Sequence, residues 1–191
     1  MTDKIILTDA DGVLLDWEAA FHDWMKAKGY TKVVDAVYDL STAYAMPKAE
    51  AKAYVREFNE SAWVAFLPAF RDARSGVAKI AEAGYKFVCI TSLSLDPKAA
   101  KLRMQNLEDV FGKDVFIELI CLDTGADKDE VLERYAGSNL IWIEDKPENA
   151  ECGAKFGLKS LLISHAHNAD YVNEDVVRVA DWAEITKVVL G

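Results

Sequence analysis

Short apolar runs that alternate with helical patterns are the feature that most constrains how this chain can fold. The runs are rich in Ile, Leu and Val and are bounded by turn residues, which is typical of strands buried on both faces. They lie at residues 4–8, 86–91, 116–122, 139–143 and 160–163. Helical spacing fills the intervals, as at residues 17–25 and 100–111. This alternation predicts an α/β fold with a Rossmann-like parallel sheet covered by helices on each side.

One interval is much longer than a strand–helix–strand crossover requires. Residues 16–75 separate the first two apolar runs and hold eleven of the chain's twenty aromatic residues. Helical patterns occur within this interval at residues 17–28 and 47–59. We therefore expect a core made of residues 1–15 and 76–191, with residues 16–75 inserted after the first strand as a small helical cap over the carboxyl edge of the sheet.

Residues typical of helix ends support this division of the chain into helices and strands. Asp96 followed by Pro97 predicts an N-cap and a first-turn proline, and Asp127 with Glu130 predicts a capping pair. Glycines stand where three helices should end, at Gly29, Gly84 and Gly112.

Composition argues against several kinds of partner and environment. The net charge is −10 and the basic residues form no run, which disfavours a nucleic acid polymer as partner. An anionic substrate would therefore need a local positive site. Three cysteines without CxxC spacing indicate reduced thiols, and the absence of a basic leader or a long apolar stretch predicts a cytoplasmic protein that does not enter a membrane.

Polar side chains follow four of the predicted strands. They are Asp9 and Asp11 after the first strand, Thr91 and Ser92 after the second, Lys128 beyond the third, and Glu144 and Asp145 after the fourth. The carboxyl ends of parallel strands meet at one edge of a sheet, where ligands bind in such folds. Carboxylates converging there repel one another unless a cation lies among them, and an all-oxygen set suits a hard ion such as Mg²⁺. The sequence therefore predicts a divalent metal site.

With a metal in place, these residue types fit phosphoryl transfer, which consists mostly of positioning and charge neutralisation. Asp9 can attack phosphorus and form an acyl phosphate. Asp11 can protonate the leaving oxygen and then deprotonate the attacking water. The Thr91 hydroxyl and nearby backbone N–H groups can bind phosphate oxygens, Lys128 adds a positive charge, and Gly12 lets the backbone approach the phosphate.

Some of these assignments have competitors. Thr91 is favoured over Ser92 as the direct phosphate contact, although Ser92 remains a candidate. Lys146 is the alternative to Lys128, because lysines are usually solvated. Glu144 either orients a metal-bound water or is only a neighbour of the metal ligand.

The histidines are not expected to bind metal. His22 lies on the face of its helix opposite the apolar stripe, and His165 and His167 have a spacing unsuited to chelation from a helix. Asn168 and Tyr171 are expected only to shape the last loop.

Six cap aromatics are expected to lie nearest the motifs. They are Trp17, Phe21, Tyr38, Tyr44, Trp63 and Phe66. Most must form the core of the cap itself, since a small helical unit needs large side chains. We expect one or two to stack on a substrate, with Trp17, Phe21 and Tyr44 as the candidate contacts.

The motifs carry a family resemblance. Residues 9–16, Asp-Ala-Asp-Gly-Val-Leu-Leu-Asp, follow an apolar strand and resemble the first motif of the haloacid dehalogenase (HAD) superfamily of phosphohydrolases. Thr91 resembles the second motif of that superfamily, Lys128 the third, and the run Ile-Glu-Asp at 143–145 the fourth. The four motifs occur in the order expected for the family.

This resemblance extends from residue 4 to about residue 163. It implies that Asp9, the backbone carbonyl of Asp11 and Asp145 bind magnesium. The insertion after the first motif is similar to the helical cap that the family places between its first two strands.

Within the superfamily, the chain most resembles the 5'(3')-deoxyribonucleotidases. The features that carry this likeness are Trp17 after Asp-Gly-Val-Leu, Glu60-Ser61, Phe-Leu-Pro at 66–68, Glu-Asp-Lys-Pro at 144–147, and a tail with His165, His167, Asn168, Arg178 and Trp182. The chain departs from that pattern at Glu144, where such enzymes commonly have a second aspartate, and in lacking a proline after Ser92. The likeness implies a 5'-nucleotidase that releases phosphate from nucleoside monophosphates.

Other functions stay open at this point. The same core could hydrolyse phosphoglycolate or a sugar phosphate, or could hold phosphate as a catalytically silent binding module. Dehalogenase chemistry is a weaker option because it would not need the magnesium carboxylates. A hydride-transfer enzyme is disfavoured, since no Gly-x-Gly-x-x-Gly follows the first strand. A homodimer is compatible with the sequence, which does not determine the oligomeric state.

Overall fold

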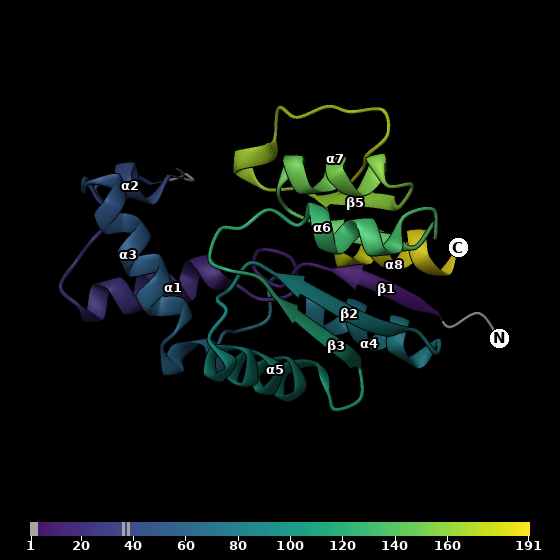
Figure 1. Cartoon of the computed structure of the whole chain (residues 1–191), viewed down its shortest axis with the longest axis horizontal. Coiled ribbons are helices and arrows are strands. Elements are labelled where there is room, and N and C mark those ends of the chain that lie inside the picture. The colour runs from purple at the N-terminus through teal and green to yellow at the C-terminus, as the bar shows by residue number, and fades with distance from the viewer. Residues whose placement is uncertain (1–3, 36, 38) are drawn as a thin grey trace.

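The computed structural model describes residues 4–35, 37 and 39–191, and its centre is a six-stranded parallel sheet of order β3-β2-β1-β4-β5-β6 (Figure 1). The strands are β1 (Ile5–Thr8), β2 (Lys86–Thr91), β3 (Phe116–Cys121), β4 (Ile141–Glu144), β5 (Lys159–Ile163) and β6 (Val177–Val179). The five predicted strands are confirmed. The edge strand β6 was missed because three residues are too few to show a period in sequence.

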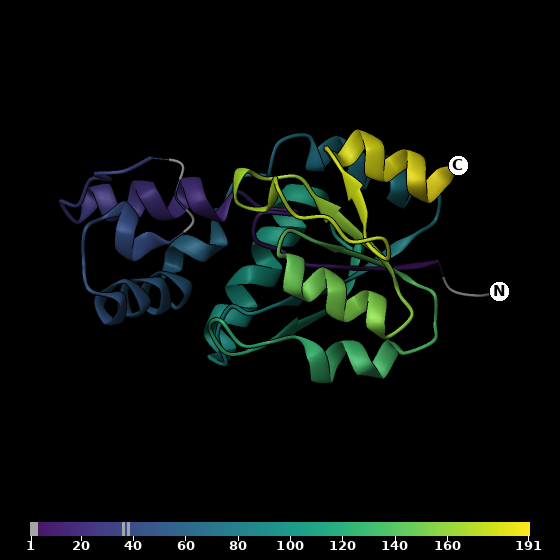
Figure 2. The same cartoon turned by 90° about the horizontal axis from the view of Figure 1, so that it is seen from above.

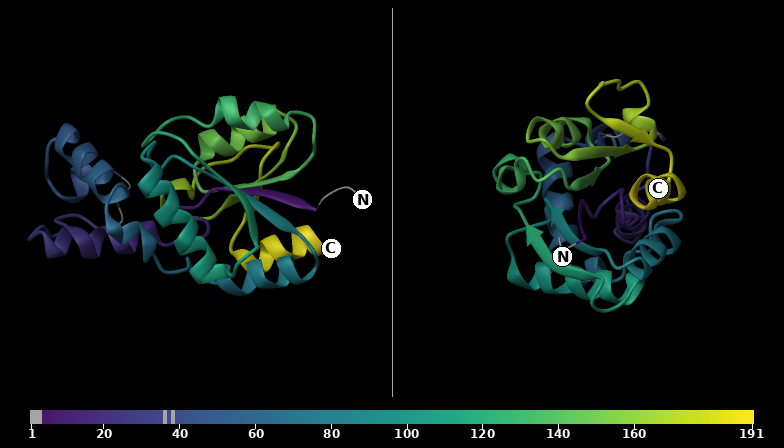
Figure 3. Two further views of the ribbon diagram at one scale, coloured as in Figure 1. Left: turned by 60° about the horizontal axis from the view of Figure 1, so that its bottom comes forward. Right: turned by 90° about the vertical axis from the view of Figure 1, so that its right-hand side faces the viewer.

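Helices cover the two faces of the sheet (Figures 2 and 3). One face carries α4 (Ala73–Glu82), α5 (Pro97–Phe111) and α8 (Trp182–Leu190), and the other carries α6 (Asp129–Leu132) and α7 (Pro147–Lys155). Short 3-10 helices are η2 (Glu133–Tyr135) and η3 (Ala166–Asn168). Neighbouring strand residues such as Ile6 and Leu7 are fully buried on opposite faces, in separate apolar clusters. The predicted α/β class with a doubly covered parallel sheet is confirmed.

The segment between β1 and β2 supplies a separate group of helices at one end of the molecule (Figures 1 and 2). It contains α1 (Trp17–Ala27), α2 (Leu40–Ala43), α3 (Lys48–Asn59) and the 3-10 helix η1 (Ala62–Ala65). We refer to these elements as the cap. The division of the chain at residues 75 and 76 stays a prediction, and this boundary falls inside α4, which packs against α8 on the core.

The predicted helix ends agree with the structure at most positions. Asp96 accepts a hydrogen bond from the backbone N–H of Lys98, and Pro97 begins α5. The three predicted C-terminal glycines all have positive φ and directly follow α1, α4 and α5 or their C-caps. The predicted capping pair is wrong: α6 starts at Asp129, and no side chain caps it.

The cysteines of the described residues are all unpaired. Cys89, Cys121 and Cys152 are free thiols. Among the described residues, no helix combines the length and apolar character needed to span a lipid bilayer.

The C-terminal helix supports the loop that follows β1. Trp182 of α8 is fully buried, and its indole N–H donates to the carbonyl of Val13 at 2.8 Å. This close approach of α8 to α4 requires Gly76, since a Cβ built there would lie 2.6 Å from the Cβ of Trp182. The Trp182–Val13 hydrogen bond, which the close Gly76–Trp182 contact allows, therefore ties the end of the chain to the loop after β1.

We expect Gly76→Ala to destabilise the protein by about 1–3 kcal/mol because overpacking exceeds the alanine gain of about 1 kcal/mol in a helix. Urea denaturation would measure the free energy of unfolding. Ala78→Gly on the exposed face of α4 is the matched control and should cost only the helix-propensity difference. A Gly76→Ala protein as stable as the wild type would contradict this packing argument.

Candidate active site

Three buried carboxylates meet where β1 and β4 end. Asp9 follows β1, Glu144 ends β4, and Asp145 comes next. One oxygen of each carboxylate lies within 4.8 Å of an oxygen of the other two. The strands place them there because β1 and β4 are adjacent and parallel, with Thr8 beside Ile143. The expected convergence of acidic side chains from two strands is present.

Lys128 lies among these carboxylates. Its Nζ is 2.9 Å from Oδ2 of Asp9 and 2.7 Å from Oε2 of Glu144, and the residue is only 2% exposed. Burial alone lowers the pKa of Lys128, but attraction to Asp9 and Glu144 outweighs it and raises the pKa above its usual value. Lys128 therefore keeps its positive charge more firmly than a solvated lysine, and the structure places it in the acidic cluster.

Glu144 uses its carboxylate oxygens to hold its neighbours. Oε1 accepts the backbone N–H groups of Asp145 and Lys146, both at 3.1 Å. Oε2 accepts from Lys128 Nζ at 2.7 Å and from Asn149 Nδ2 at 3.2 Å. Because four donors already occupy Glu144, its geometry suits positioning of Lys128 and the Asp145 loop better than direct metal binding.

Asp9 and Asp145 carry more negative charge than their surroundings neutralise. Burial raises the pKa of Asp9 to about 7, with a further upward contribution from Glu144. Burial also raises the pKa of Asp145 to about 6, and the charge on Asp9 adds to that increase. A cation bound between the two carboxylates would remove this repulsion.

The donor set fits a hard divalent cation. The cluster found among the described residues is all-oxygen, which suits Mg²⁺, and none of the three histidines belongs to it. Asp9 and Asp145 are the members best able to hold the ion, since Glu144 is fully hydrogen-bonded. Direct ligation by these residues stays a prediction.

Asp11 has a partner that the sequence analysis missed. Arg103 of α5 is 0% exposed and binds the Asp11 carboxylate with both terminal nitrogens, at 2.5 and 3.3 Å. Burial lowers the pKa of Arg103, but Asp11 outweighs that effect, so the guanidinium stays charged. One signal was available in the sequence: Arg103 lies four residues from both Ala99 and Leu107, and so occupies the buried stripe of its helix.

The two hydroxyls after β2 differ in their bonding. Ser92 Oγ donates to the carbonyl of Ala126 at 2.7 Å, which occupies its hydrogen. Thr91 Oγ1 is buried and has no hydrogen-bond partner among the described residues. A buried hydroxyl without a partner is costly unless a ligand completes it. This difference supports Thr91 over Ser92 as the phosphate contact.

Gly12 is required by the acidic cluster itself. Its φ of 75° is strained for other residues, and an added Cβ would lie 2.7 Å from Oδ2 of Asp145. The sequence analysis expected Gly12 to admit a phosphate. The structure shows in addition that Gly12 admits the side chain of Asp145.

The last loop lies against the same site. His165 Nε2 is 2.7 Å from the carbonyl oxygen of Gly12, while His167 Nε2 and Asn168 Nδ2 lie 3.1 and 2.8 Å from that of Asp145. His165 and His167 were expected not to bind metal, and Asn168 was expected only to shape the last loop. Their contacts to the loops after β1 and β4 depend on tertiary packing, which no local sequence pattern encodes.

The cap aromatics mostly pack on one another. Phe21 is 1% exposed and contacts Trp17 in a stacked arrangement with centroids 4.6 Å apart. The Tyr44 hydroxyl lies 2.5 Å from His22 Nδ1 within the cap. Trp17 is half-buried, and its indole N–H donates to Asn59 at 2.9 Å. Trp63 and Phe66 are exposed, and Tyr38 lies outside the described residues.

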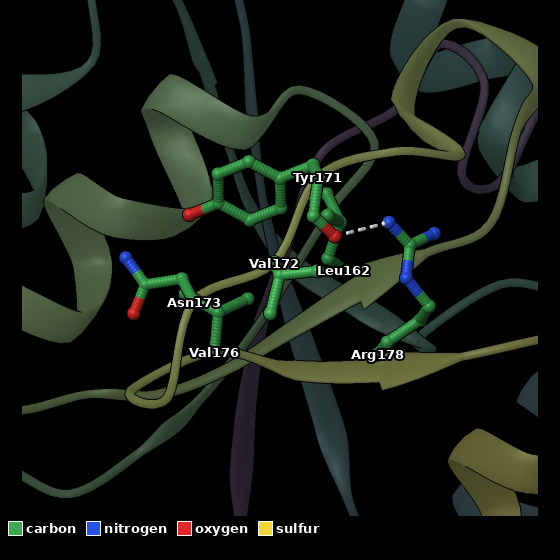
Figure 4. Close-up of a pocket in the computed structure, with 6 residues that line it drawn as sticks. All are labelled: Leu162, Tyr171, Val172, Asn173, Val176 and Arg178. Atoms are coloured by element: carbon green, nitrogen blue, oxygen red, sulfur yellow. Dashed lines mark hydrogen bonds between the residues drawn. The ribbon is translucent and has the colours of Figure 1, made fainter.

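A cavity of about 300 Å³ lies beside β5 and β6, and none of the three carboxylates lines it (Figure 4). Its lining residues are Leu162, Tyr171, Val172, Asn173, Val176 and Arg178. Since it includes no candidate site residue, we do not assign the chemistry to this cavity.

Known structures share the fold over their whole length. A haloacid dehalogenase-like family hydrolase from Streptococcus pneumoniae matches with a TM-score of 0.67 and 15% identity, covering 97% of this chain and 98% of that chain. CbbY from Rhodobacter sphaeroides in complex with phosphate matches with a TM-score of 0.62 and 15% identity, covering 96% of each chain. D,D-heptose 1,7-bisphosphate phosphatase from B. bronchiseptica, complexed with magnesium and phosphate, matches with a TM-score of 0.58 and 14% identity over 98% of each chain.

The chain therefore has a haloacid dehalogenase-like fold, as the motifs implied. No protein-family model and no curated protein matches the sequence. The finer resemblance to deoxyribonucleotidases stays a prediction.

We expect Mg²⁺ to raise the melting temperature more at about pH 8 than at about pH 5.5. A carboxyl whose pKa is raised to about 7, as at Asp9, takes up a proton on folding, so the metal-free protein loses stability as the pH rises through 7. Above that pH the cation replaces the proton. Differential scanning fluorimetry with Mg²⁺ or EDTA measures this dependence.

Asp145→Asn is the control for that measurement and should lose most of the magnesium-dependent stabilisation at the higher pH. Equal Mg²⁺ shifts at the two pH values in the wild type would contradict a site built on these carboxylates.

Proposed function

We propose that this protein is a magnesium-dependent phosphatase that acts through a phosphoryl group carried on Asp9. One observation carries the proposal: Asp9 and Asp145 are buried beside Lys128 at the sheet edge where the Thr91 hydroxyl has no hydrogen-bond partner within the described part of the chain. This is a site with negative ligands for a cation and positive and hydroxyl groups for a phosphate. The phosphate-containing structures that share the fold support the same class of chemistry.

In the proposed reaction, a carboxylate oxygen of Asp9 attacks phosphorus, and the bond from phosphorus to the leaving oxygen breaks. Asp11, which must first take up a proton and loosen its pair with Arg103, gives that proton to the leaving oxygen. Water then attacks phosphorus, passes a proton to Asp11, and releases inorganic phosphate with Asp9 regenerated. Lys128 stabilises the negative charge around Asp9 throughout, at a distance of 2.9 Å.

Magnesium, when bound by Asp9, Asp145 and the Asp11 carbonyl, would supply charge neutralisation for the phosphoryl oxygens. Thr91 would donate its hydroxyl to one of those oxygens. Burial of the site excludes bulk water, which strengthens these interactions.

In this scheme, Arg103 holds the side chain of Asp11 in place. Its two hydrogen bonds hold the Asp11 carboxylate from within the core. Such a bidentate arrangement restricts the direction in which Asp11 presents its oxygens. Arg103 is thus a positioning residue for proton transfer.

For the substrate, we propose a nucleoside monophosphate, most simply a deoxyribonucleotide. The support is the aromatic cap, in which Trp17 stands at the start of α1 and is half-buried, together with the resemblance to the deoxyribonucleotidases. A base could stack on its ring. Phosphoglycolate, a sugar phosphate and silent phosphate binding are the competing functions.

We predict that Asp9→Asn lowers phosphate release from an aryl phosphate by on the order of 10³-fold or more, since the amide cannot act as the nucleophile. Released phosphate and circular dichroism would be measured together. Asp109→Asn, exposed on α5, is the matched control and should retain full activity. Retained turnover in a folded Asp9→Asn protein would refute the covalent role.

We also predict that nucleoside monophosphates are hydrolysed in preference to phosphoglycolate and sugar phosphates. Trp17→Leu should raise KM for the preferred nucleotide more than KM for a small aryl phosphate, because the ring that would stack on the base is lost together with its hydrogen bond to Asn59. Trp63→Leu, a more exposed cap tryptophan, serves as the comparison. Turnover of every phosphate ester except nucleotides would exclude the proposed substrate.

A further inference from the structure

The loop after β5 joins the two loops that hold the acidic cluster. We call residues 164–168 the clamp segment. His165 Nε2 lies 2.7 Å from the carbonyl oxygen of Gly12, and because a carbonyl only accepts, the imidazole donates. His167 Nε2 lies 3.1 Å from the carbonyl oxygen of Asp145 and 3.5 Å from its Oδ2. One short segment therefore contacts the loop after β1 and the loop after β4.

Asn168 completes the contact with Asp145. It is 1% exposed, and its Nδ2 donates to the carbonyls of Asp145 at 2.8 Å and Ile163 at 2.9 Å. Its Oδ1 accepts from the His165 backbone N–H at 3.0 Å and from Arg178 at 3.1 Å. All the hydrogen-bonding positions of this amide are used, so its orientation is fixed.

Two further supports make the clamp segment rigid. The ring of His165 stacks between Phe70, with centroids 4.8 Å apart, and His167, with centroids 5.0 Å apart. Arg178 of β6 donates to the backbone carbonyls of Asn168 and Tyr171, and Figure 4 shows its guanidinium directed at the Tyr171 oxygen. Contacts with Arg178 of β6 and the aromatic stack therefore hold the clamp segment in place.

The spacing that the clamp sets is tight. Gly12 has no room for a Cβ, which would lie 2.7 Å from Oδ2 of Asp145. A small separation of the two loops would move the Asp145 carboxylate away from Asp9. Metal affinity depends strongly on such ligand geometry.

We propose that His165 and Asn168 are positioning residues that hold the Gly12 and Asp145 loops together and thereby set the affinity of the site for Mg²⁺. This inference rests on the proposed magnesium site. Neither residue needs to touch the ion or the substrate. Their effect on Mg²⁺ passes through the backbone carbonyls of Gly12 and Asp145, which lie next to the carboxylates that would bind the ion.

The test compares two substitutions at His165 in the full chain. His165→Phe keeps a flat ring for stacking on Phe70 but removes the donor to Gly12, and we expect it to weaken Mg²⁺ binding by about 10- to 100-fold. His165→Gln keeps an N–H donor and should restore most of the affinity. Isothermal titration calorimetry with MgCl₂ alone measures this without any substrate.

Asn168→Ala is a second test of the clamp and should also weaken Mg²⁺ binding. Tyr171→Phe is its matched control. Tyr171 lies on the same loop, but its hydroxyl donates to Glu151 and not to the site, so that variant should bind Mg²⁺ like the wild type. Activity adds a second readout. The clamp predicts that saturating Mg²⁺ restores kcat in His165→Phe, because the groups that perform the chemistry are intact.

A folded His165→Phe protein with wild-type Mg²⁺ affinity would overturn the clamp, as would a loss of kcat that saturating Mg²⁺ does not restore. Wild-type protein that binds Mg²⁺ but releases no phosphate from any ester would refute the phosphatase proposal alone. The calorimetric comparison would still decide the clamp in that case. Wild-type protein that does not bind Mg²⁺ would overturn both.

Discussion

The burial of Asp9 and Asp145 side by side is the constraint around which the site is arranged. Adjacent parallel strands deliver the two carboxylates into one buried volume, and burial disfavours their ionised forms. Lys128 offsets part of the charge, and its position depends on Glu144. The negative charge that remains makes the site suited to a divalent cation. Position 12 is a glycine because the Asp145 carboxylate leaves no space for a larger side chain.

The core and the cap are joined at the loops that would bind phosphate. Asn59 of α3 donates to the carbonyl of Leu93 at 2.9 Å, two residues after Thr91. Arg56, one turn earlier on the same helix, pairs with Asp123 at 3.0 Å in the loop leading to Lys128. Asn59 also accepts from the Trp17 indole. A substrate held by Trp17 would thus be connected through one buried amide to the loop that carries Thr91, the proposed phosphate contact.

Local patterns predicted the fold and the meeting of acidic side chains at the strand ends, because strands buried on both faces are apolar and ligands lie at their carboxyl ends. The same patterns indicated Lys128, which lies beside Asp9 and Glu144, and Thr91, whose role as a phosphate contact stays a prediction. Arg103 was missed because one arginine in an amphipathic helix is usually solvated, and its partner Asp11 is 92 residues away. His165 was missed for a similar reason, since only tertiary packing brings it to Gly12, 153 residues earlier.

A phosphoryl group on Asp9 is the central claim, and direct detection of it is the sharpest test. Asp11→Asn protein mixed with an aryl phosphate and Mg²⁺ should form the acyl phosphate, since an aryl leaving group needs little protonation, and should hydrolyse it slowly because the general base is lost. Acid quenching followed by peptide mass spectrometry should find the phosphoryl group on Asp9. Catalytic turnover with no phosphorylated peptide, or with the phosphoryl group on another residue, would contradict the account.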